Sequence, residues 1–277
     1  MTILKIFATL SVLVFSAMAV FEAPPPDPSA TAMGDIPPAI GPGPTSLFYN
    51  GGITAGGGYR RSFGHADFDQ LSAWAGWQND KVGRLSAVFG SCAAGDLSSE
   101  TSVSLGFTRS IFSDIHTELN LALRGDYFSL SYGNSLGGVD LGSSGSFGLS
   151  LAGEAIVYKR TKIALIAENL TATNLGVEGD IELPRAVSAA IGYSPYNSTE
   201  MAFHLRRETG AEFVYGLGVA FSPHEIVIFR LGAATNPDRV TAGFGLKYRF
   251  ARFDYALKSH PALPLTHSAS IGIDLER

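Results

Sequence analysis

The feature that most constrains the fold of this chain is an alternation of apolar and polar residues with a period of two. Val103, Leu105 and Phe107 alternate with serine, glycine and threonine, and a second segment around Leu121 shows the same pattern. Successive side chains of a β-strand point to opposite faces of the sheet. Each segment therefore predicts a strand with one apolar and one polar face.

The polar face separates a soluble β-sandwich from a membrane β-barrel. A sandwich turns this face to bulk water and needs lysine and glutamate there, whereas here it carries mostly glycine, serine, threonine and alanine. Charged residues make up 16% of the chain, below the roughly 25% of soluble domains, and the mean hydropathy is +0.16. Small polar side chains suit the inside of a closed barrel, which crosses lipid with every backbone group paired. The sequence predicts an all-β transmembrane antiparallel β-barrel, with a periplasmic β-sandwich as the alternative.

The number of strands follows from counting the alternating segments. Thirteen candidates lie at 68–77, 82–89, 102–108, 118–124, 146–152, 162–169, 186–194, 201–206, 211–221, 226–234, 240–248, 252–258 and 267–275. Both termini of the chain lie in the periplasm only if the number of strands is even. The segment from Ile53 to Phe63 supplies a fourteenth strand. We therefore expect a barrel of about fourteen strands over residues 53–277. Aromatic residues near strand ends are typical of an interfacial girdle: Tyr158, Tyr193, Tyr196, Phe221, Tyr248 and Phe250.

The N-terminal region predicts export. Lys5 precedes an apolar run, and Ala17-Met18-Ala19 fits a cleavage site, so residues 1–19 are predicted to be a signal peptide. Residues 20–52 are rich in proline, which favours extended conformations. This segment is predicted to be either a linker or a plug that enters the barrel lumen from the periplasmic side. The expected location is the outer membrane of a Gram-negative bacterium.

The composition excludes several function classes. The net charge of −5 provides no basic surface for nucleic acid, and the single cysteine, Cys92, has no partner for a disulfide. No nucleophile elbow, zinc-protease motif or phosphate loop is present. We expect neither an enzyme nor a site for a metal or cofactor.

The C-terminal third resembles the PorV/PorQ-type outer-membrane proteins, relatives of the FadL fatty-acid transporters. The resemblance rests on Asp254-Tyr255-Ala256 followed by Thr266-His267-Ser268 and Ser270, and extends more loosely to Asn169-Leu170, Leu183-Pro184 and Phe48-Tyr49-Asn50. After Asn50 the chain has Gly51-Gly52 where the family has Pro-Ala-Gly. The resemblance implies a fourteen-stranded barrel. The residues that match the family signature are Asn50, Asn169, Pro184, Asp254, Tyr255, Ala256, Thr266, His267 and Ser270.

Two functions are compatible with such a barrel. The first is a passive transporter or channel for small, hydrophobic compounds. The second is a non-conducting scaffold that docks a component of an envelope or type IX-like secretion system. Expected partners are outer-membrane lipid, the barrel-assembly machinery, and either a hydrophobic small molecule or a secretion-system component. The polar side chains expected in the lumen are Glu118, Arg124, Asp126, Glu154, Glu168, His204, Arg206, Arg230, Lys247 and Asp254.

The hairpin near residue 250 gives a prediction about single contacts. If Phe250-Ala251 form a two-residue turn, Tyr248 lies opposite Phe253 and Lys247 lies opposite Asp254. We therefore expect an ion pair between Lys247 and Asp254 inside the barrel.

Overall fold

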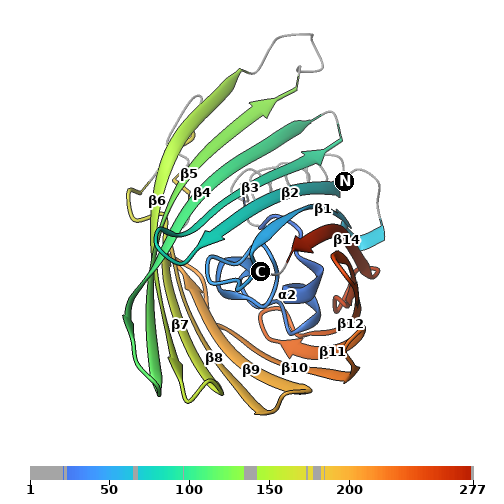
Figure 1. Cartoon of the computed structure of the whole chain (residues 1–277). Coiled ribbons are helices and arrows are strands. Elements are labelled where there is room, and N and C mark those ends of the chain that lie inside the picture. Colours follow the sequence, from blue (N-terminus) through green and yellow to red (C-terminus); the bar gives the residue numbers. More distant parts are fainter. Residues whose placement is uncertain are drawn as a thin grey trace, which may run out of the picture.

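The protein is a closed antiparallel β-barrel (Figure 1). The computed structural model describes residues 21, 24–64, 68–95, 97–133, 142–172, 174–176, 182–183 and 185–275, so the expected signal peptide and Pro184 lie outside the described residues. Each strand pairs with its neighbours in sequence, and β1 pairs with β14. The predicted barrel of fourteen strands is confirmed. The strands are β1 (Ile53–Arg61), β2 (Asp69–Asn79), β3 (Gly83–Ala94), β4 (Ser98–Ser113), β5 (Thr117–Tyr132), β6 (Ser143–Val157), β7 (Thr161–Glu168), β8 (Ala186–Tyr196), β9 (Thr199–Glu208), β10 (Val214–His224), β11 (Val227–Ala234), β12 (Arg239–Tyr248), β13 (Ala251–Lys258) and β14 (Thr266–Leu275).

The two faces of the wall follow the alternation in the sequence. Val103, Leu105 and Phe107 of β4 lie exposed on the outside, whereas Gly106 between them faces inward and is buried. The six aromatic residues expected in a girdle are likewise exposed on the outside. An apolar outer face with a polar inner face is the pattern of a barrel that sits in lipid.

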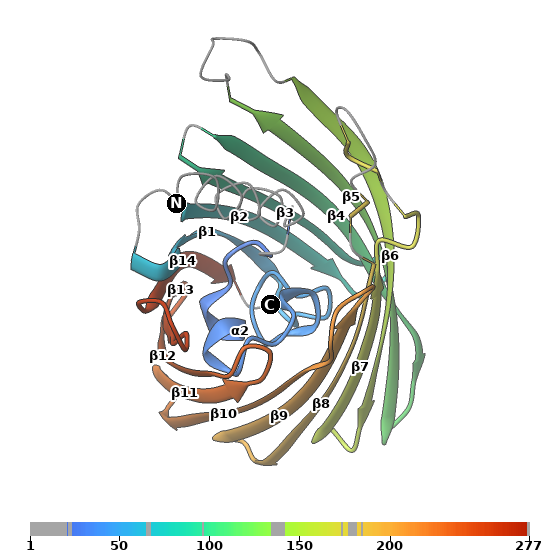
Figure 2. The same cartoon turned by 180° about the vertical axis from the view of Figure 1, so that it is seen from behind.

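The barrel has two different ends. At one end, six connections of two or three residues join β2 to β3, β4 to β5, β6 to β7, β8 to β9, β10 to β11 and β12 to β13. We call it the short-turn end, and the opposite end the loop end. The wall is also higher on one side, because β4, β5 and β6 have 15 or 16 residues whereas β7, β11 and β13 have eight (Figures 1 and 2).

The hairpin between β12 and β13 differs from the expectation. Its turn is Arg249-Phe250, and Arg249 has a φ of 53°, the left-handed conformation that tight hairpin turns require. Tyr248 therefore lies opposite Ala251, and Asp254 lies opposite Gly245. The predicted turn at Phe250-Ala251 is wrong by one residue, which shifts each predicted pair by two.

Glycine allows close packing where β1 closes the barrel against β14. Gly56 lies opposite Gly272 across this seam. A Cβ atom added to Gly56 would lie 2.5 Å from Cζ2 of Trp74, and one added to Gly272 would lie 3.1 Å from the same atom. The buried indole of Trp74 therefore lies directly against the backbone of the seam.

Residues 24–52, which we call the lumen segment, lie inside the barrel (Figures 1 and 2). The segment contains the short helix α2 (Pro28–Ala32) and the 3-10 helix η1 (Pro38–Ile40). It joins β1 at the short-turn end. Phe21, which precedes the segment, lies at the loop end, where its backbone N–H donates to Glu100. No helix of the described residues is long and apolar enough to span a membrane.

Asp27 holds the lumen segment together. Its buried carboxylate accepts hydrogen bonds from the backbone N–H groups of Ser29 and Ala30, and so caps the start of α2. The same carboxylate accepts a hydrogen bond from the hydroxyl of Thr45. Because Thr45 lies 18 residues further along the chain, this contact closes the segment into a compact loop.

Candidate functional site in the barrel lumen

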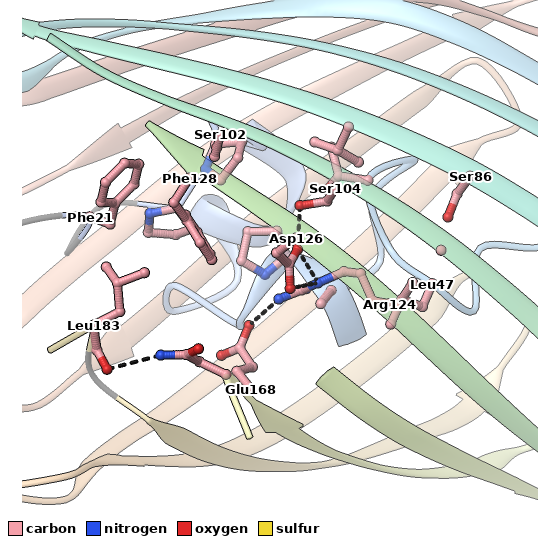
Figure 3. A pocket seen from close by; sticks show the side chains of 18 of the residues that line it. Phe21, Leu47, Ser86, Ser102, Ser104, Arg124, Asp126, Phe128, Glu168 and Leu183 are labelled. Atoms are coloured by element: carbon pink, nitrogen blue, oxygen red, sulfur yellow. Dashed lines mark hydrogen bonds and ion pairs between the residues drawn. The ribbon is translucent and has the colours of Figure 1, made fainter. Parts of the chain in front are cut away.

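A cavity of about 140 Å³, which we call the inner cavity, lies between the lumen segment and the wall of β3–β7 (Figure 3). Phe21, Pro24, Val88, Phe128 and Leu183 form an apolar part of its lining. The rings of Phe21 and Phe128 meet edge to face with their centroids 5.1 Å apart. This part of the cavity suits a small apolar molecule.

Five charged side chains, which we call the charged ladder, form the polar side of the inner cavity. Nε of Arg124 lies 2.8 Å from Oδ1 of Asp126, and its Nη2 lies 3.1 Å from Oε1 of Glu168 (Figure 3). Arg206 contacts Glu168 as well, and its Nη2 lies 2.9 Å from Oε1 of Glu208. Each charge of the ladder thus has an opposite charge beside it, so the ladder is a structural element of the wall.

A larger cavity of about 490 Å³, the outer cavity, lies between the lumen segment and the loop-end parts of β1, β9, β10, β12 and β13. Glu168, Arg206 and Glu208 line both cavities. The charged ladder therefore stands between the two spaces.

The backbone of the lumen segment is bound to the wall of β9–β12. The N–H of Gly34 donates to the hydroxyl of Thr241 at 3.0 Å, and that hydroxyl donates to the carbonyl of Ala32 at 3.1 Å. Nε2 of His204 lies 2.8 Å from the carbonyl oxygen of Gly34. A Cβ atom on Gly232 of β11 would lie 2.1 Å from the nitrogen of Gly34. The segment therefore lies in direct contact with the strand backbone.

Asp35 adds ion pairs on this side. Its Oδ2 lies 3.2 Å from Nζ of Lys258 and 3.1 Å from Nε of Arg239. Burial alone would raise the pKa of Asp35, but the charges of Lys258, Arg239 and Arg60 outweigh it and lower the pKa to about 2. Asp35 is therefore ionised at neutral pH.

Tyr49 fixes the other end of the lumen segment, near the short turns. Its hydroxyl donates to Oδ2 of Asp274 at 2.5 Å and accepts from Nη1 of Arg252 at 2.8 Å. The guanidinium groups of Arg84 and Arg252 lie over its ring, 5.5 and 5.6 Å from the centroid. The segment is thus fastened to the barrel just before β1 begins.

The predicted ion pair between Lys247 and Asp254 is wrong. Oδ1 of Asp254 lies 2.8 Å from Nη1 of Arg230, and its Oδ2 lies 2.5 Å from Nε of Arg252. Nζ of Lys247 lies 3.8 Å from Oδ2 of Asp274 instead. The cause is the register, which places Gly245 opposite Asp254. A Cβ atom on Gly245 would lie 2.6 Å from Oδ1 of Asp254, so the missing side chain leaves room for the ion pair.

The lumen segment meets the wall of β5–β7 through apolar contacts. Ala39 and Leu47 pack against Ala122, Ala152 and Ile166 in one buried cluster. The side chains on the wall are mostly alanines, which give little area for contact. This side of the segment is therefore held less firmly than the side that faces β9–β14.

The ten residues predicted to line the lumen lie at inward-facing positions of their strands. Arg124, Asp126, Glu168 and Arg206 form most of the charged ladder. Glu154 faces the lumen and accepts a hydrogen bond from Asn120, and Glu118 lies on the same face near the short-turn end. The other four, His204, Arg230, Lys247 and Asp254, make the contacts described above. Whether they contribute to function stays a prediction.

Several lumen residues were not predicted from the sequence. Arg60, Arg239 and Lys258 face inward at alternate positions with small or polar neighbours, so the period of two was a signal that could have identified them. Asp35 and Tyr49 lie outside any alternating segment, and no pattern in the sequence indicates their contacts.

The residues that resemble the family signature make structural contacts. The side-chain amide of Asn169 donates to the carbonyl of Leu183 at 2.9 Å, and the N–H of Phe63 donates to the hydroxyl of Thr266 at 3.1 Å. The hydroxyl of Tyr255 lies 2.8 Å from Nδ1 of His267. Ala256 and Ser270 are buried, and Asn50 is exposed. Among the described residues, no group of three or more His, Cys, Asp or Glu side chains is placed to hold a metal ion.

The closed barrel has the same fold as several solved β-barrel structures. The barrel is similar to the CymD monoaromatic hydrocarbon channel, with a TM-score of 0.66 and 13% identity over 93% of this chain and 100% of that chain. It is also similar to the Ralstonia pickettii toluene transporter TbuX, with a TM-score of 0.62 and 13% identity over 93% of this chain and 100% of that chain. The Pseudomonas putida toluene transporter TodX gives a TM-score of 0.61 and 12% identity over 91% of this chain and 97% of that chain. No family model and no curated protein sequence matches the chain. These likenesses show the fold alone, and the resemblance to PorV/PorQ-type proteins and their FadL relatives stays a prediction.

Proposed function

We propose that the protein is a passive outer-membrane channel for small apolar molecules, of the size of a single aromatic ring. The observation that carries this proposal is the inner cavity, where aromatic, proline and leucine side chains lie beside the lumen segment of a closed barrel. The similar barrels include proteins described as a monoaromatic hydrocarbon channel and as toluene transporters. Their substrates suggest the class to test first.

The contacts of the lumen segment suggest how such a molecule would pass. Ala39 and Leu47 line the inner cavity and pack against the alanines of β5 and β6. These side-chain contacts are apolar, and one buried hydrogen bond, from the hydroxyl of Thr108 on β4 to the carbonyl of Leu47 at 2.9 Å, would have to break when they separate. We propose that this part of the segment moves away from the wall during passage, while Gly34 and Asp35 keep their contacts.

Filling the inner cavity tests the proposal. Ser102 lines the cavity, and Thr101, the preceding residue of the same strand, points to the opposite face. We expect Ser102→Phe to lower the uptake of labelled toluene by cells that express the protein, and Thr101→Phe to leave it unchanged. Equal uptake by cells with and without the protein would contradict a channel function and favour a non-conducting scaffold.

A further inference from the structure

The outer cavity contains a second group of charges whose composition differs from that of the charged ladder. Arg60, Arg239 and Lys258 all line this cavity, and the carboxylate they share is that of Asp35. Arg239 and Lys258 lie within 3.2 Å of it, and the charge of Arg60 also acts on it. Among the described residues that line this cavity, three cations therefore surround one carboxylate, and the charge of Asp27, which does not line the cavity, also acts on Arg60.

The other charges that line the outer cavity do not restore the balance at this point. Arg206 is paired with Glu168 and Glu208 of the charged ladder. Glu212 lies in the exposed connection between β9 and β10. The local excess of positive charge therefore stays on the side of the cavity formed by β1, β12 and β13.

Arg60 and Arg239 each have a buried Nε without a hydrogen-bond partner among the described residues, and Arg60 is the more informative of the two. Its side chain is only 3% exposed, and its guanidinium donates to the carbonyl of Pro24, to the side chain of Gln70 and to the hydroxyl of Thr31. All three acceptors are neutral. Its Nε has no partner although it is buried. A buried guanidinium without a carboxylate beside it is costly unless an anion reaches it.

We infer that the outer cavity binds a small organic anion, whose carboxylate lies among Arg60, Arg239 and Lys258. An apolar lining beside these cations favours an organic anion over an inorganic one. This lining is formed by Ile36, Pro37, Phe63, Val214 and Pro237. A compact aromatic carboxylate such as benzoate fits both parts of the lining. This inference concerns a different cavity from the inner one and does not depend on the passage of neutral molecules.

The inference is tested by binding benzoate to the purified full-length protein in detergent, with benzyl alcohol as the neutral control. We expect benzoate to bind at least about tenfold more tightly, the ratio that one charge-assisted contact of 1.4 kcal/mol provides. Lys258→Gln should weaken benzoate binding severalfold and leave benzyl alcohol unchanged. The matched control is Lys162→Gln, because Lys162 faces the lumen at a distance from the outer cavity, which it does not line.

A second variant gives an effect of opposite sign. Asp35→Asn removes the carboxylate that competes for the three cations, so benzoate should raise the Tm of this variant more than that of the wild type. Equal binding of benzoate and benzyl alcohol, or an unaltered benzoate affinity of Lys258→Gln, would overturn the inference. Displacement of benzoate by an equal concentration of inorganic phosphate would overturn the assignment to a carboxylate.

Discussion

The lumen segment lies between two walls of the same barrel that hold it by different interactions. Toward β9–β14 it makes backbone hydrogen bonds through Gly34 and ion pairs through Asp35. Toward β5–β7 it makes apolar contacts through Ala39 and Leu47, with the inner cavity beside them. Polar contacts in a buried place are directional and costly to break, whereas apolar contacts with small side chains tolerate displacement. One wall therefore acts as the support of the segment, and the other forms the space beside it.

The largest difference in the free energy of unfolding is expected between variants of two buried aspartates, one from each wall. Asp254 is the carboxylate partner of both Arg230 and Arg252, whereas Asp126 pairs with Arg124, which also contacts Glu168. Breaking a buried pair costs roughly 3–5 kcal/mol when the remaining charge has no second partner. Asp254→Asn should therefore lower the free energy of unfolding in urea by more than Asp126→Asn does.

The corrected register adds a control to that experiment. Lys247 is paired with Asp274, so adding Lys247→Asp to the Asp254 variant should restore none of the lost stability. Adding Arg230→Gln should restore part of it, because it removes one of the two guanidinium groups left without a carboxylate. Rescue by Lys247→Asp would mean that the register is as first predicted.

The next effect is expected when a glycine of β11, in the supporting wall, is replaced in parallel with a glycine of β4, on the opposite side of the lumen segment. A Cβ atom on Gly232 would meet the backbone nitrogen of Gly34 at 2.1 Å, whereas one on Gly106 would meet side-chain atoms of Leu47 and Ser86 at 2.5 Å. Backbone cannot move aside as a side chain can, and overpacking costs about 1–3 kcal/mol. We expect Gly232→Ala to make the lumen segment accessible to protease and Gly106→Ala to leave it protected. Equal protection of the lumen segment from protease in both variants would contradict the proposal that the two sides of the barrel hold the segment differently.

A smaller effect is expected at Tyr49, where the lumen segment joins the barrel. Tyr49→Phe keeps the ring between Arg84 and Arg252 but removes the hydroxyl that bridges Arg252 and Asp274. One hydrogen bond of this kind contributes roughly 1.5–3 kcal/mol because its partners are charged. Protease cleavage after Asn50 should become faster, with the barrel itself still folded by its electrophoretic mobility. Unchanged cleavage would show that the stacked ring alone fastens the segment.

The smallest effect appears only in acid. The pKa of Asp35 is about 2 in the folded protein and 3.8 in the unfolded chain, so its ion pairs stabilise the folded state fully above pH 4. This contribution is lost as the pH falls from about 4 toward 2. Cleavage of the lumen segment by an acid protease should therefore increase over that interval. Asp35→Asn, which cannot titrate, should show no such step.

The sequence was sufficient to predict the strands and their faces, but not the register. A period of two fixes which side of the wall a residue faces, and Asp254 faces inward as expected. A shift of two positions in pairing leaves every face unchanged, so the alternation could not distinguish Lys247 from Gly245 as the residue opposite Asp254. The contacts of Asp35 and Tyr49 were beyond prediction, because the lumen segment has no periodic pattern and binds residues more than 200 positions away.

The indole of Trp74 on the seam between β1 and β14 provides a reporter for assembly. The chain has two tryptophans, and Trp77 is exposed on the outside of the same strand. In a Trp77→Phe variant, the remaining fluorescence comes from a ring that lies against the seam where the first and last strands meet. A blue shift of its emission would then mark the closure of the barrel. The rate of this shift could be compared with the rate of strand formation measured by circular dichroism.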